Sequence, residues 1–312
     1  MNEHQWGFRE ARSTEDLLLY LTETWYKAID SKKVVGILMI DFKKAFDSVS
    51  HKVLLKKLSA HGVSGDFLEY MMDYLTGRSQ ITKVNDIISS EASVEFGVPQ
   101  GSILGPQCFS TYVDDLSDVG EEELDLYADD SETYTIADTV DEAMINLQRQ
   151  ADQISNYSVD NCLTIHPDKC QILILSKHKF IGPLQPVKIN NKVIEVTEKT
   201  KCLGVMLDNR LSWGPHTEVV CKSFSTKLRN LYKMNSLDKL TLRTIYNTGI
   251  LPSVLYGILI WGNCATHLLD DVEKIHIKAA RFIEKIKKSV KDDVLTLVKW
   301  KPLDYYYKIK ST

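Results

Sequence analysis

Three aspartates stand where a carboxylate is costly to bury and could therefore do chemistry. Asp41 follows the apolar run VVGILMI, and Asp129-Asp130 follows LDLYA, so both sites end an apolar, strand-like segment. An unpaired carboxylate in such a place carries a large desolvation cost. Taken alone, Asp41 is more simply a cap on the following turn. Two strand-end sites 88 residues apart can instead meet on adjacent strands of one sheet.

Clustered carboxylates indicate a cation. They repel one another and are stable as anions only with positive charge between them. Oxygen ligands that leave water positions open suit Mg²⁺ or Mn²⁺. Two such ions roughly 4 Å apart stabilise both the attacking and the leaving oxygen in phosphoryl transfer. Because successive strand residues point to opposite faces, we expect Asp129 to face Asp41 and Asp130 to assist.

The segment GVPQGSILGP, residues 97–106, is the next chemical signal. Glycines and prolines spaced this closely make a loop that a ligand can approach at the backbone. A plain turn before a helix is the simpler reading of the segment alone. Gly101 and Gly105 flanking Ser102, with Gln100 beside them, also suit a loop that contacts a nucleotide and its template base.

Apolar periodicity predicts the elements that position these residues. The first half should contain helices and strands in alternation, with Asp129-Asp130 at a hairpin turn and with Thr139 and Glu142 as the capping box of a long helix. The expected helices are 14–32, 51–60, 66–76, 103–116 and 139–158; the expected strands are 34–42, 80–85, 91–96, 124–128, 132–136, 170–176, 187–189, 192–196 and 201–207. After Trp213 only helices are expected, at 216–235, 239–249, 253–262 and 268–288.

Charge divides the chain at the same place. Residues 209–312 carry 18 Lys+Arg and 9 Asp+Glu, whereas residues 1–208 carry 20 and 33. An acidic first part could gather metal ions and a basic second part could bind phosphates. Two solvated surfaces of opposite sign explain the same distribution equally well.

Composition limits the class of protein. Hydrophobic residues make up 44% and charged residues 26% of 312 positions, as in globular proteins. No apolar run reaches the roughly 18 residues of a membrane span, and the N-terminus lacks the apolar core of a signal peptide, so we expect an intracellular protein. The six cysteines include no CxxC pair, so we expect reduced thiols and no zinc site.

Four blocks in this order, IDFKKAFDSV, GVPQGSILGP, YADD and CLGVMLD, resemble the palm of reverse transcriptases, especially those of non-LTR (LINE-like) retrotransposons. The opening QWGFREARSTEDLL is similar to the fingers segment that precedes that palm. The resemblance covers residues 4 to about 290. It implies an α+β fold: partial fingers (1–33), a palm with an antiparallel sheet and packed helices (34–208), and an all-helical thumb with a C-terminal extension (209–312).

The resemblance also implies roles in an RNA-directed DNA polymerase. Asp41, Asp129 and Asp130 would hold two Mg²⁺ or Mn²⁺ ions. Phe46 matches the aromatic gate against a ribose 2′-OH. Gln100 and Gly101 would contact the incoming deoxynucleoside triphosphate and the template. Lys169, which could equally be an exposed turn lysine, matches the proton donor to pyrophosphate.

Contacts with the RNA template, the DNA primer and their hybrid are implied elsewhere in the chain. The residues are Arg9 and Arg12 near the start, Leu203 and Gly204 of the primer-holding hairpin, and Lys222, Lys227 and Arg229 of the thumb. Nearby apolar residues are expected in the thumb core, namely Leu228, Leu231, Tyr232, Trp261 and Phe282. Protein partners are not indicated.

Some features depart from the family pattern. From the resemblance we expect the sequence to start inside the fingers and not to include the usual endonuclease domain, and we expect Ser131-Glu132 to add a carboxylate beside the metal site. These departures are typical of a fragment or a decaying genomic copy. One alternative is therefore a truncated relic that at most binds nucleic acid. Another palm-type enzyme, such as an RNA-dependent RNA polymerase or a nucleotide cyclase, is disfavoured by Phe46 and the PQG loop.

Overall fold

The structure, a computed structural model, describes residues 2–177, 183–287 and 293–311. The chain forms two compact units. The N-terminal unit comprises Met1–Thr14 and Ala28–Thr197, and the C-terminal unit comprises Glu15–Lys27 and Glu198–Thr312. Helix α1 (Thr14–Asp30) therefore contributes most of its length to the C-terminal unit. The fold is mixed α and β with a sheet of mostly antiparallel strands.

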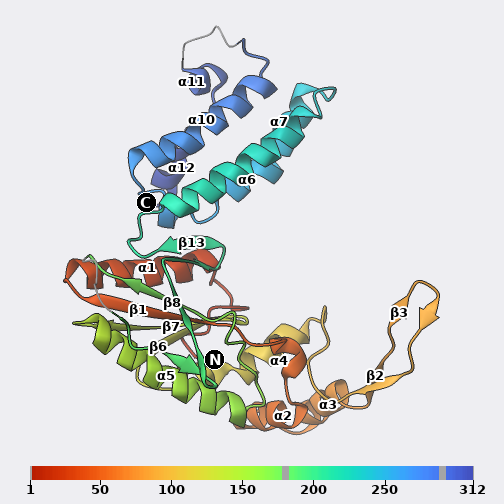
Figure 1. Cartoon of the computed structure of the whole chain (residues 1–312). Coiled ribbons are helices and arrows are strands. Elements are labelled where there is room, and N and C mark those ends of the chain that lie inside the picture. The colour runs from red at the N-terminus through yellow and green to blue at the C-terminus, as the bar shows by residue number, and fades with distance from the viewer. Residues whose placement is uncertain (1, 178–182, 288–292, 312) are drawn as a thin grey trace. The chain divides into compact units, whose positions relative to one another are not determined.

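A five-stranded sheet is the centre of the N-terminal unit (Figure 1). Its strand order is β11 (Glu195–Thr197), β8 (Gln171–Leu175), β1 (Val34–Ile40), β7 (Asp130–Ala137), β6 (Glu123–Tyr127). Only the β11–β8 pair is parallel. The apolar run at the start of the predicted strand 34–42 forms β1, and the prediction of a buried strand there is confirmed. β1 has a neighbouring strand on each side and is almost wholly buried.

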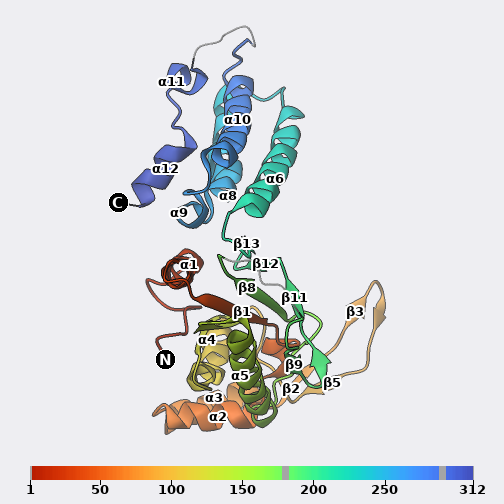
Figure 2. The same ribbon diagram turned by 60° about the vertical axis from the view of Figure 1, so that its left-hand side comes forward.

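Helix α5 (Val140–Asp160) covers one face of this sheet in both ribbon views (Figures 1 and 2). Thr139 caps the helix as predicted, since its side chain accepts a hydrogen bond from the Glu142 backbone N–H. Gly36 in β1 lets the helix approach closely. A Cβ atom there would lie 3.1 Å from a methyl group of Leu147.

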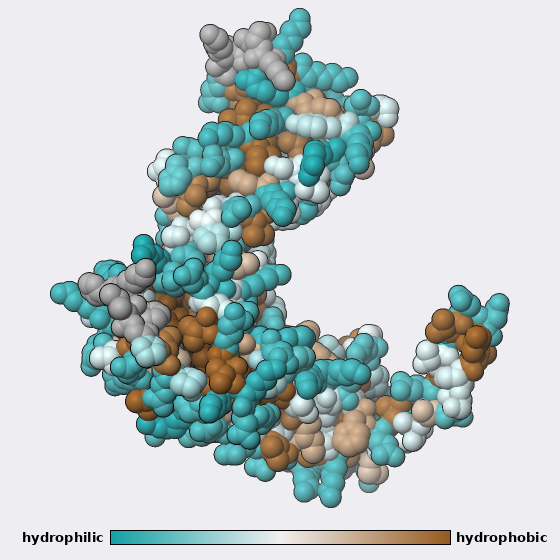
Figure 3. All heavy atoms as spheres, in the orientation of Figure 1, coloured by the Kyte–Doolittle hydropathy of each residue, from teal (hydrophilic) through white to brown (hydrophobic). Residues whose placement is uncertain are grey.

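Helices and a long ribbon complete the N-terminal unit. The helices are α2 (His51–Ala60), α3 (Asp66–Leu75) and α4 (Leu104–Tyr112), with the 3-10 turns η1 (Ala45–Ser48) and η2 (Asp114–Asp118). The ribbon pairs β2 (Arg78–Gln80) with β5 (Ala92–Val94), and β3 (Lys83–Val84) with β4 (Ile87–Ile88). Its tip exposes apolar side chains, which Figure 3 shows in brown; Ile87 is 77% exposed. A separate short hairpin pairs β9 (Lys188–Ile189) with β10 (Lys192–Val193).

The C-terminal unit is helical apart from one hairpin. The hairpin pairs β12 (Lys199–Cys202) with β13 (Val205–Asp208). The helices are α6 (Gly214–Tyr232), α7 (Lys239–Ile245), the π-helical turn η3 (Tyr246–Ile250), α8 (Leu251–Leu255), α9 (Ile258–Trp261), α10 (Thr266–Ile283), α11 (Val294–Val298) and α12 (Leu303–Lys310). No helix within the described ranges combines the length and apolar character needed to cross a bilayer.

Several predicted elements were wrong in detail. Residues 201–207, expected as one strand from the apolar pattern, form the β12–β13 hairpin that the family resemblance implied, with its turn at Leu203 and Gly204 and φ of 44° and 87°. The helix expected at 253–262 is interrupted at Gly257, whose φ of 66° is incompatible with a continuous helix. The helix expected at 268–288 ends at Ile283, and Lys288 lies outside the described residues. Helices α11 and α12 were not predicted.

The predicted thumb core is confirmed for Leu228, Leu231 and Trp261, which are buried. Tyr232 was predicted wrongly, because it is 37% exposed and contacts Phe282 edge to face. All six cysteines carry free thiols, as expected.

Candidate active site

The strand register brings the two acidic sites to one end of the sheet. β1 and β7 are antiparallel with Ile40 opposite Ser131. One further step of this register sets Asp41 level with Asp130, whereas Asp129 was expected to face it. Asp129 lies in the two-residue turn between β6 and β7, where Ala128 takes a φ of 59°. Segments 88 residues apart thus present their carboxylates from adjacent strands.

Asp41 has surroundings that suit a cation. Its Oδ1 is buried and has no hydrogen-bond partner, although Lys169 Nζ lies 3.3 Å away as an ion pair. The Asp41 carbonyl accepts a hydrogen bond from the His166 N–H, which fixes the residue beside the Lys169 turn. Ligand atoms of Asp41, Asp129 and Asp130 are not gathered within 4.8 Å of one another in the described part of the chain. Hard carboxylate oxygens with one unpartnered buried atom nevertheless fit a divalent ion.

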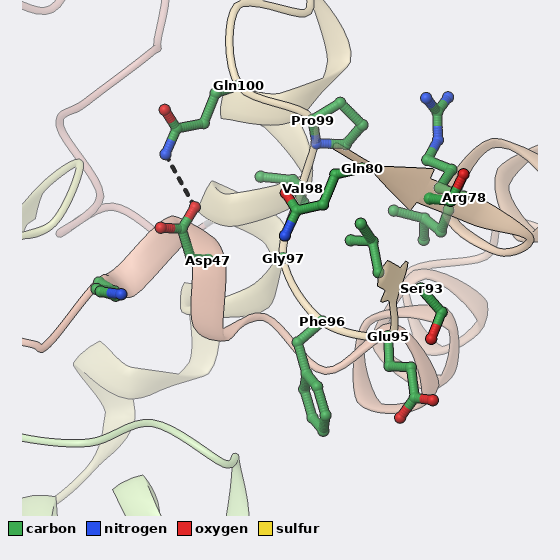
Figure 4. Close-up of a pocket in the computed structure, with 14 residues that line it drawn as sticks. Asp47, Arg78, Gln80, Ser93, Glu95, Phe96, Gly97, Val98, Pro99 and Gln100 are labelled. Carbon is green, nitrogen blue, oxygen red and sulfur yellow. Dashed lines mark hydrogen bonds between the residues drawn. The ribbon is translucent and has the colours of Figure 1, made fainter. Parts of the chain in front are cut away.

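The GVPQG loop is attached to the turn that follows β1. Its Gly97 N–H donates to Val49 O at 2.8 Å, and its Val98 N–H donates to Phe46 O at 3.0 Å. Gln100 Nε2 donates to Asp47 Oδ1 at 2.9 Å (Figure 4). A cleft of about 1010 Å³ lies between this loop and the β2–β5 ribbon. Hydrogen bonds therefore join the loop that carries Gln100 to the turn that carries Phe46.

Phe46 is held by other rings. It stacks on Phe109 with centroids 4.2 Å apart and meets Phe8 edge to face at 6.5 Å. The side chain remains partly exposed. Gly101 has a φ of 76° and open space around the position of a Cβ atom. An aromatic ring fixed in this way can act as a rigid wall beside a ligand.

The two arginines of the opening segment make local contacts. Arg9 Nη1 donates to Asn2 O at 2.6 Å, and the Arg12 guanidinium lies 4.1 Å from the Trp6 ring centroid. Both arginines therefore contact other residues of the same opening segment, residues 2–12. The template contacts expected of both arginines stay a prediction.

The predicted primer and thumb residues all lie in the C-terminal unit. Leu203 O accepts a hydrogen bond of 2.6 Å from Tyr256 Oη, and a Cβ atom at Gly204 would meet the same ring at 3.0 Å. Lys222 and Arg229 are exposed on α6, whereas Lys227 Nζ donates to Ser253 Oγ at 2.5 Å.

Sequence reasoning missed the role of Asp208. The carboxylate of this residue at the end of β13 accepts hydrogen bonds from the backbone N–H groups of Arg210, Ser212 and Trp213. It thereby shapes the turn from the hairpin into α6. An acidic residue that closes a strand before a polar turn was the available signal, and it lay within CLGVMLD.

Two further carboxyl groups are buried behind the Asp129-Asp130 turn. Asp125 and Glu132 lie opposite each other on β6 and β7, and are 0% and 2% exposed. Burial, with the charges of Asp125 and Asp130, raises the pKa of Glu132 well above its ordinary value. Burial also raises the pKa of Asp125, despite hydrogen bonds from His4 and Trp6 that act to lower it. The carboxylate that Glu132 was expected to add is thus enclosed in protein.

Comparison with known proteins identifies the relatives of this chain. The sequence model of the family described as reverse transcriptase (RNA-dependent DNA polymerase) matches residues 1–207. Among the similar proteins is a probable RNA-directed DNA polymerase from transposon BS of Drosophila melanogaster, 28% identical, with 90% of this chain and 32% of that protein covered. Another is the RNA-directed DNA polymerase from mobile element jockey of Drosophila funebris, 29% identical, with 90% and 31% covered.

The chain spans about a third of the length of these relatives. A solved structure of telomerase from Candida albicans aligns with 95% of this chain and 55% of its own, at a TM-score of 0.48 and 13% identity.

Proposed function

The chain belongs to the reverse transcriptase family, and from this premise we propose that it is the polymerase domain of a non-LTR retrotransposon. In this proposal it extends a DNA primer on an RNA template, using deoxynucleoside triphosphates. The observation that carries the proposal is the β1–β7 register, which sets Asp41 level with Asp130 at the end of two adjacent strands. Members of the family generally use divalent metal ions.

Asp41, Asp129 and Asp130 would hold two such ions, proposed as Mg²⁺ or Mn²⁺. When bound, the ions would stabilise the attacking and leaving oxygens of nucleotidyl transfer. The Oδ1 of Asp41, which is buried and accepts no hydrogen bond, supports this assignment. Lys169, which forms an ion pair with the same carboxylate, would give a proton to departing pyrophosphate.

Phe46 and Gln100 would select the nucleotide. The Phe46 ring is braced by Phe109 and would press against the sugar, so that an added 2′-hydroxyl is excluded. Gln100, oriented by Asp47, would contact the nucleotide together with the Gly101 backbone. Gly101 suits this role because nothing lies near the position of its absent side chain.

Each unit contains residues that we propose contact nucleic acid. The β12–β13 turn at Leu203-Gly204 would contact the primer end, and Lys222, Lys227 and Arg229 of α6 would neutralise phosphates. Arg9 and Arg12 are proposed to contact the template. An intracellular location remains part of the proposal.

A primer-extension assay on an RNA template with Mg²⁺ tests the function. We expect extension with deoxynucleotides, and a loss of at least about a hundredfold in Asp129→Ala and Asp41→Asn. The matched control is Asp160→Asn, an exposed aspartate at the end of α5, which should leave the rate unchanged. Absence of extension at every enzyme concentration would identify a catalytically inactive relic. Preference for ribonucleotides would indicate another palm-type polymerase.

Sugar selection tests the gate separately. Phe46→Val should admit ribonucleotides, because a smaller side chain no longer occupies the space that a 2′-hydroxyl needs. Unchanged discrimination in an active Phe46→Val enzyme would exclude Phe46 as the gate.

A further inference from the structure

The opening segment of the chain runs along the outer edge of the sheet. Gln5 pairs with Leu126 of β6 in a parallel bridge. The Trp6 N–H donates to Leu126 O at 2.7 Å, and the Leu126 N–H donates to His4 O at 2.9 Å. Because side chains alternate along an extended segment, His4 and Trp6 share a face. That face meets Asp125 of β6.

Three potential metal ligands meet at this edge. Single ligand atoms of His4, Glu123 and Asp125 all lie within 4.8 Å of one another. Glu123 and Asp125 are two residues apart on β6 and therefore point to the same face. His4 Nδ1 lies 3.0 Å from Asp125 Oδ1, and Trp6 Nε1 donates to that same oxygen at 3.0 Å.

The second oxygen of Asp125 has no such partner. Asp125 is fully buried, and its Oδ2 is without a hydrogen-bond partner. Glu132 lies directly opposite Asp125 in the β6–β7 register, hence on the same face, and its Oε1 is also buried without a partner. Buried carboxyl oxygens normally accept hydrogen bonds, since leaving one unmatched costs about 1–3 kcal/mol or more. The unmatched Oδ2 belongs to the carboxylate that already contacts the His4 imidazole, so an oxygen and a nitrogen ligand for a cation lie side by side.

We propose that His4, Glu123 and Asp125 bind one divalent transition-metal ion of the zinc class. Imidazole nitrogen with carboxylate oxygens is a ligand set that Zn²⁺ accepts, whereas Mg²⁺ prefers oxygen alone. The ion can enter from solvent, because Glu123 is exposed and His4 is partly exposed. Cysteines, whose spacing argued against zinc, take no part.

This site shares no residue with Asp41, Asp129 and Asp130, so it does not depend on the proposed function. An ion there would join the opening segment to β6, the strand that leads into the Asp129-Asp130 turn. Binding of the ion would hold residues 4–6 along the sheet edge through a metal–ligand bond as well as through backbone hydrogen bonds.

Calorimetric titration of ZnCl₂ into the full chain, with millimolar MgCl₂ present throughout, tests the proposal. We expect one Zn²⁺ per chain that excess Mg²⁺ does not displace. Asp125→Asn keeps Oδ1 as an acceptor for Trp6 but removes the charge and the free oxygen, and should weaken Zn²⁺ binding at least tenfold. His4→Gln, which changes a partly exposed side chain, should do the same. The control His267→Gln, on the exposed surface of α10, should bind as the unmodified chain does.

Thermal unfolding supplies a second measurement. Zn²⁺ should raise the Tm of the unmodified chain and of His267→Gln, and leave that of His4→Gln unchanged. If Zn²⁺ binds with equal affinity to His4→Gln and to the unmodified chain, the site is elsewhere and the proposal is wrong. If no Zn²⁺ binds and Asp125→Asn is more stable than the unmodified chain, Asp125 and Glu132 share a proton instead of a metal ion. Neither readout requires polymerase activity.

Discussion

Replacing Asp208 by alanine should destabilise the C-terminal unit more than an ordinary helix cap would. The Asp208 carboxylate accepts from Arg210 N at 3.1 Å, Ser212 N at 2.9 Å and Trp213 N at 3.0 Å. Leu211 and Trp213 both adopt positive φ, at 49° and 65°, where side-chain-bearing residues are strained. The carboxylate is what offsets this strain.

The magnitude follows from the lost hydrogen bonds. Asp208 is 7% exposed and Trp213 is 1% exposed, so water replaces the acceptor poorly at Trp213 N. A hydrogen bond to a charged group contributes about 1.5–3 kcal/mol, and contributions within one network do not add fully. We therefore expect Asp208→Ala to lower the free energy of unfolding by about 4 kcal/mol. Asp208→Asn keeps one acceptor oxygen and should lose about half as much.

Urea unfolding followed by tryptophan fluorescence measures the effect. Four of the five tryptophans, residues 25, 213, 261 and 300, belong to the C-terminal unit, so the signal reports on that unit. The matched control is Asp238→Ala, which removes an exposed aspartate cap from α7 and should cost clearly less than Asp208→Ala. The reasoning is refuted if Asp208→Ala costs no more than Asp238→Ala.

Three further changes test other parts of the structure. Gly97→Ala should raise the KM for deoxynucleotides several-fold in steady-state kinetics, because its φ is 90° and the new Cβ would lie 3.0 Å from the Asp47 Cα. Gly7→Ala should lower both Tm and primer extension, because the added Cβ would lie 2.4 Å from the backbone nitrogen of Ala128, the residue before Asp129. Burial lowers the pKa of His216 and of His276 to about 4, below the value of 6.5 in the unfolded chain. The free energy of unfolding should therefore be highest above pH 6.5, where both histidines are neutral in both states. It should fall by roughly 3 kcal/mol per histidine toward pH 4, as urea titrations at each pH would measure.

Controls accompany these changes. Gly62→Ala introduces a side chain at a φ of 89° with no atom within 4 Å, so it should share the backbone strain of Gly97→Ala without its kinetic effect. Normal Tm and extension in Gly7→Ala would show that the opening segment is not packed against the turn. His276→Gln should reduce the pH dependence of stability, and an equal slope in that variant would contradict the burial argument.

Local patterns predicted local structure well. The apolar run 34–40 and the alternation around 123–137 are sufficient to predict strands, because burial on a sheet selects those patterns. The capping-box spacing of Thr139 and Glu142 likewise predicted the start of a helix. The Glu142 Oε2, however, accepts a hydrogen bond from the Asp138 N–H and not from the Thr139 N–H. Sequence therefore located the two acidic strand ends.

Contacts between distant segments were not predictable from one sequence. The Gln100–Asp47 hydrogen bond joins residues 53 positions apart, and nothing in either segment specifies the other. Asp125 and Glu132 face each other only because the turn at 128–129 sets their register. Gly257 interrupts a helix because the chain must change direction there, which a periodic apolar pattern does not reveal.

The pairing of residues 4–6 with β6 also bears on solubility. A sheet has two outer strands, and an outer strand with free N–H and C=O groups is a template on which another chain can add a strand. Here β6 is an outer strand of the five-stranded sheet and belongs to the hairpin that carries Asp129 and Asp130, and backbone hydrogen bonds with His4 and Trp6 occupy part of its edge. Loss of the opening segment would expose that edge, with the buried Leu124 and Leu126 beside it, to a second molecule. Pairing with the opening segment therefore shields part of this sheet edge from edge-to-edge association.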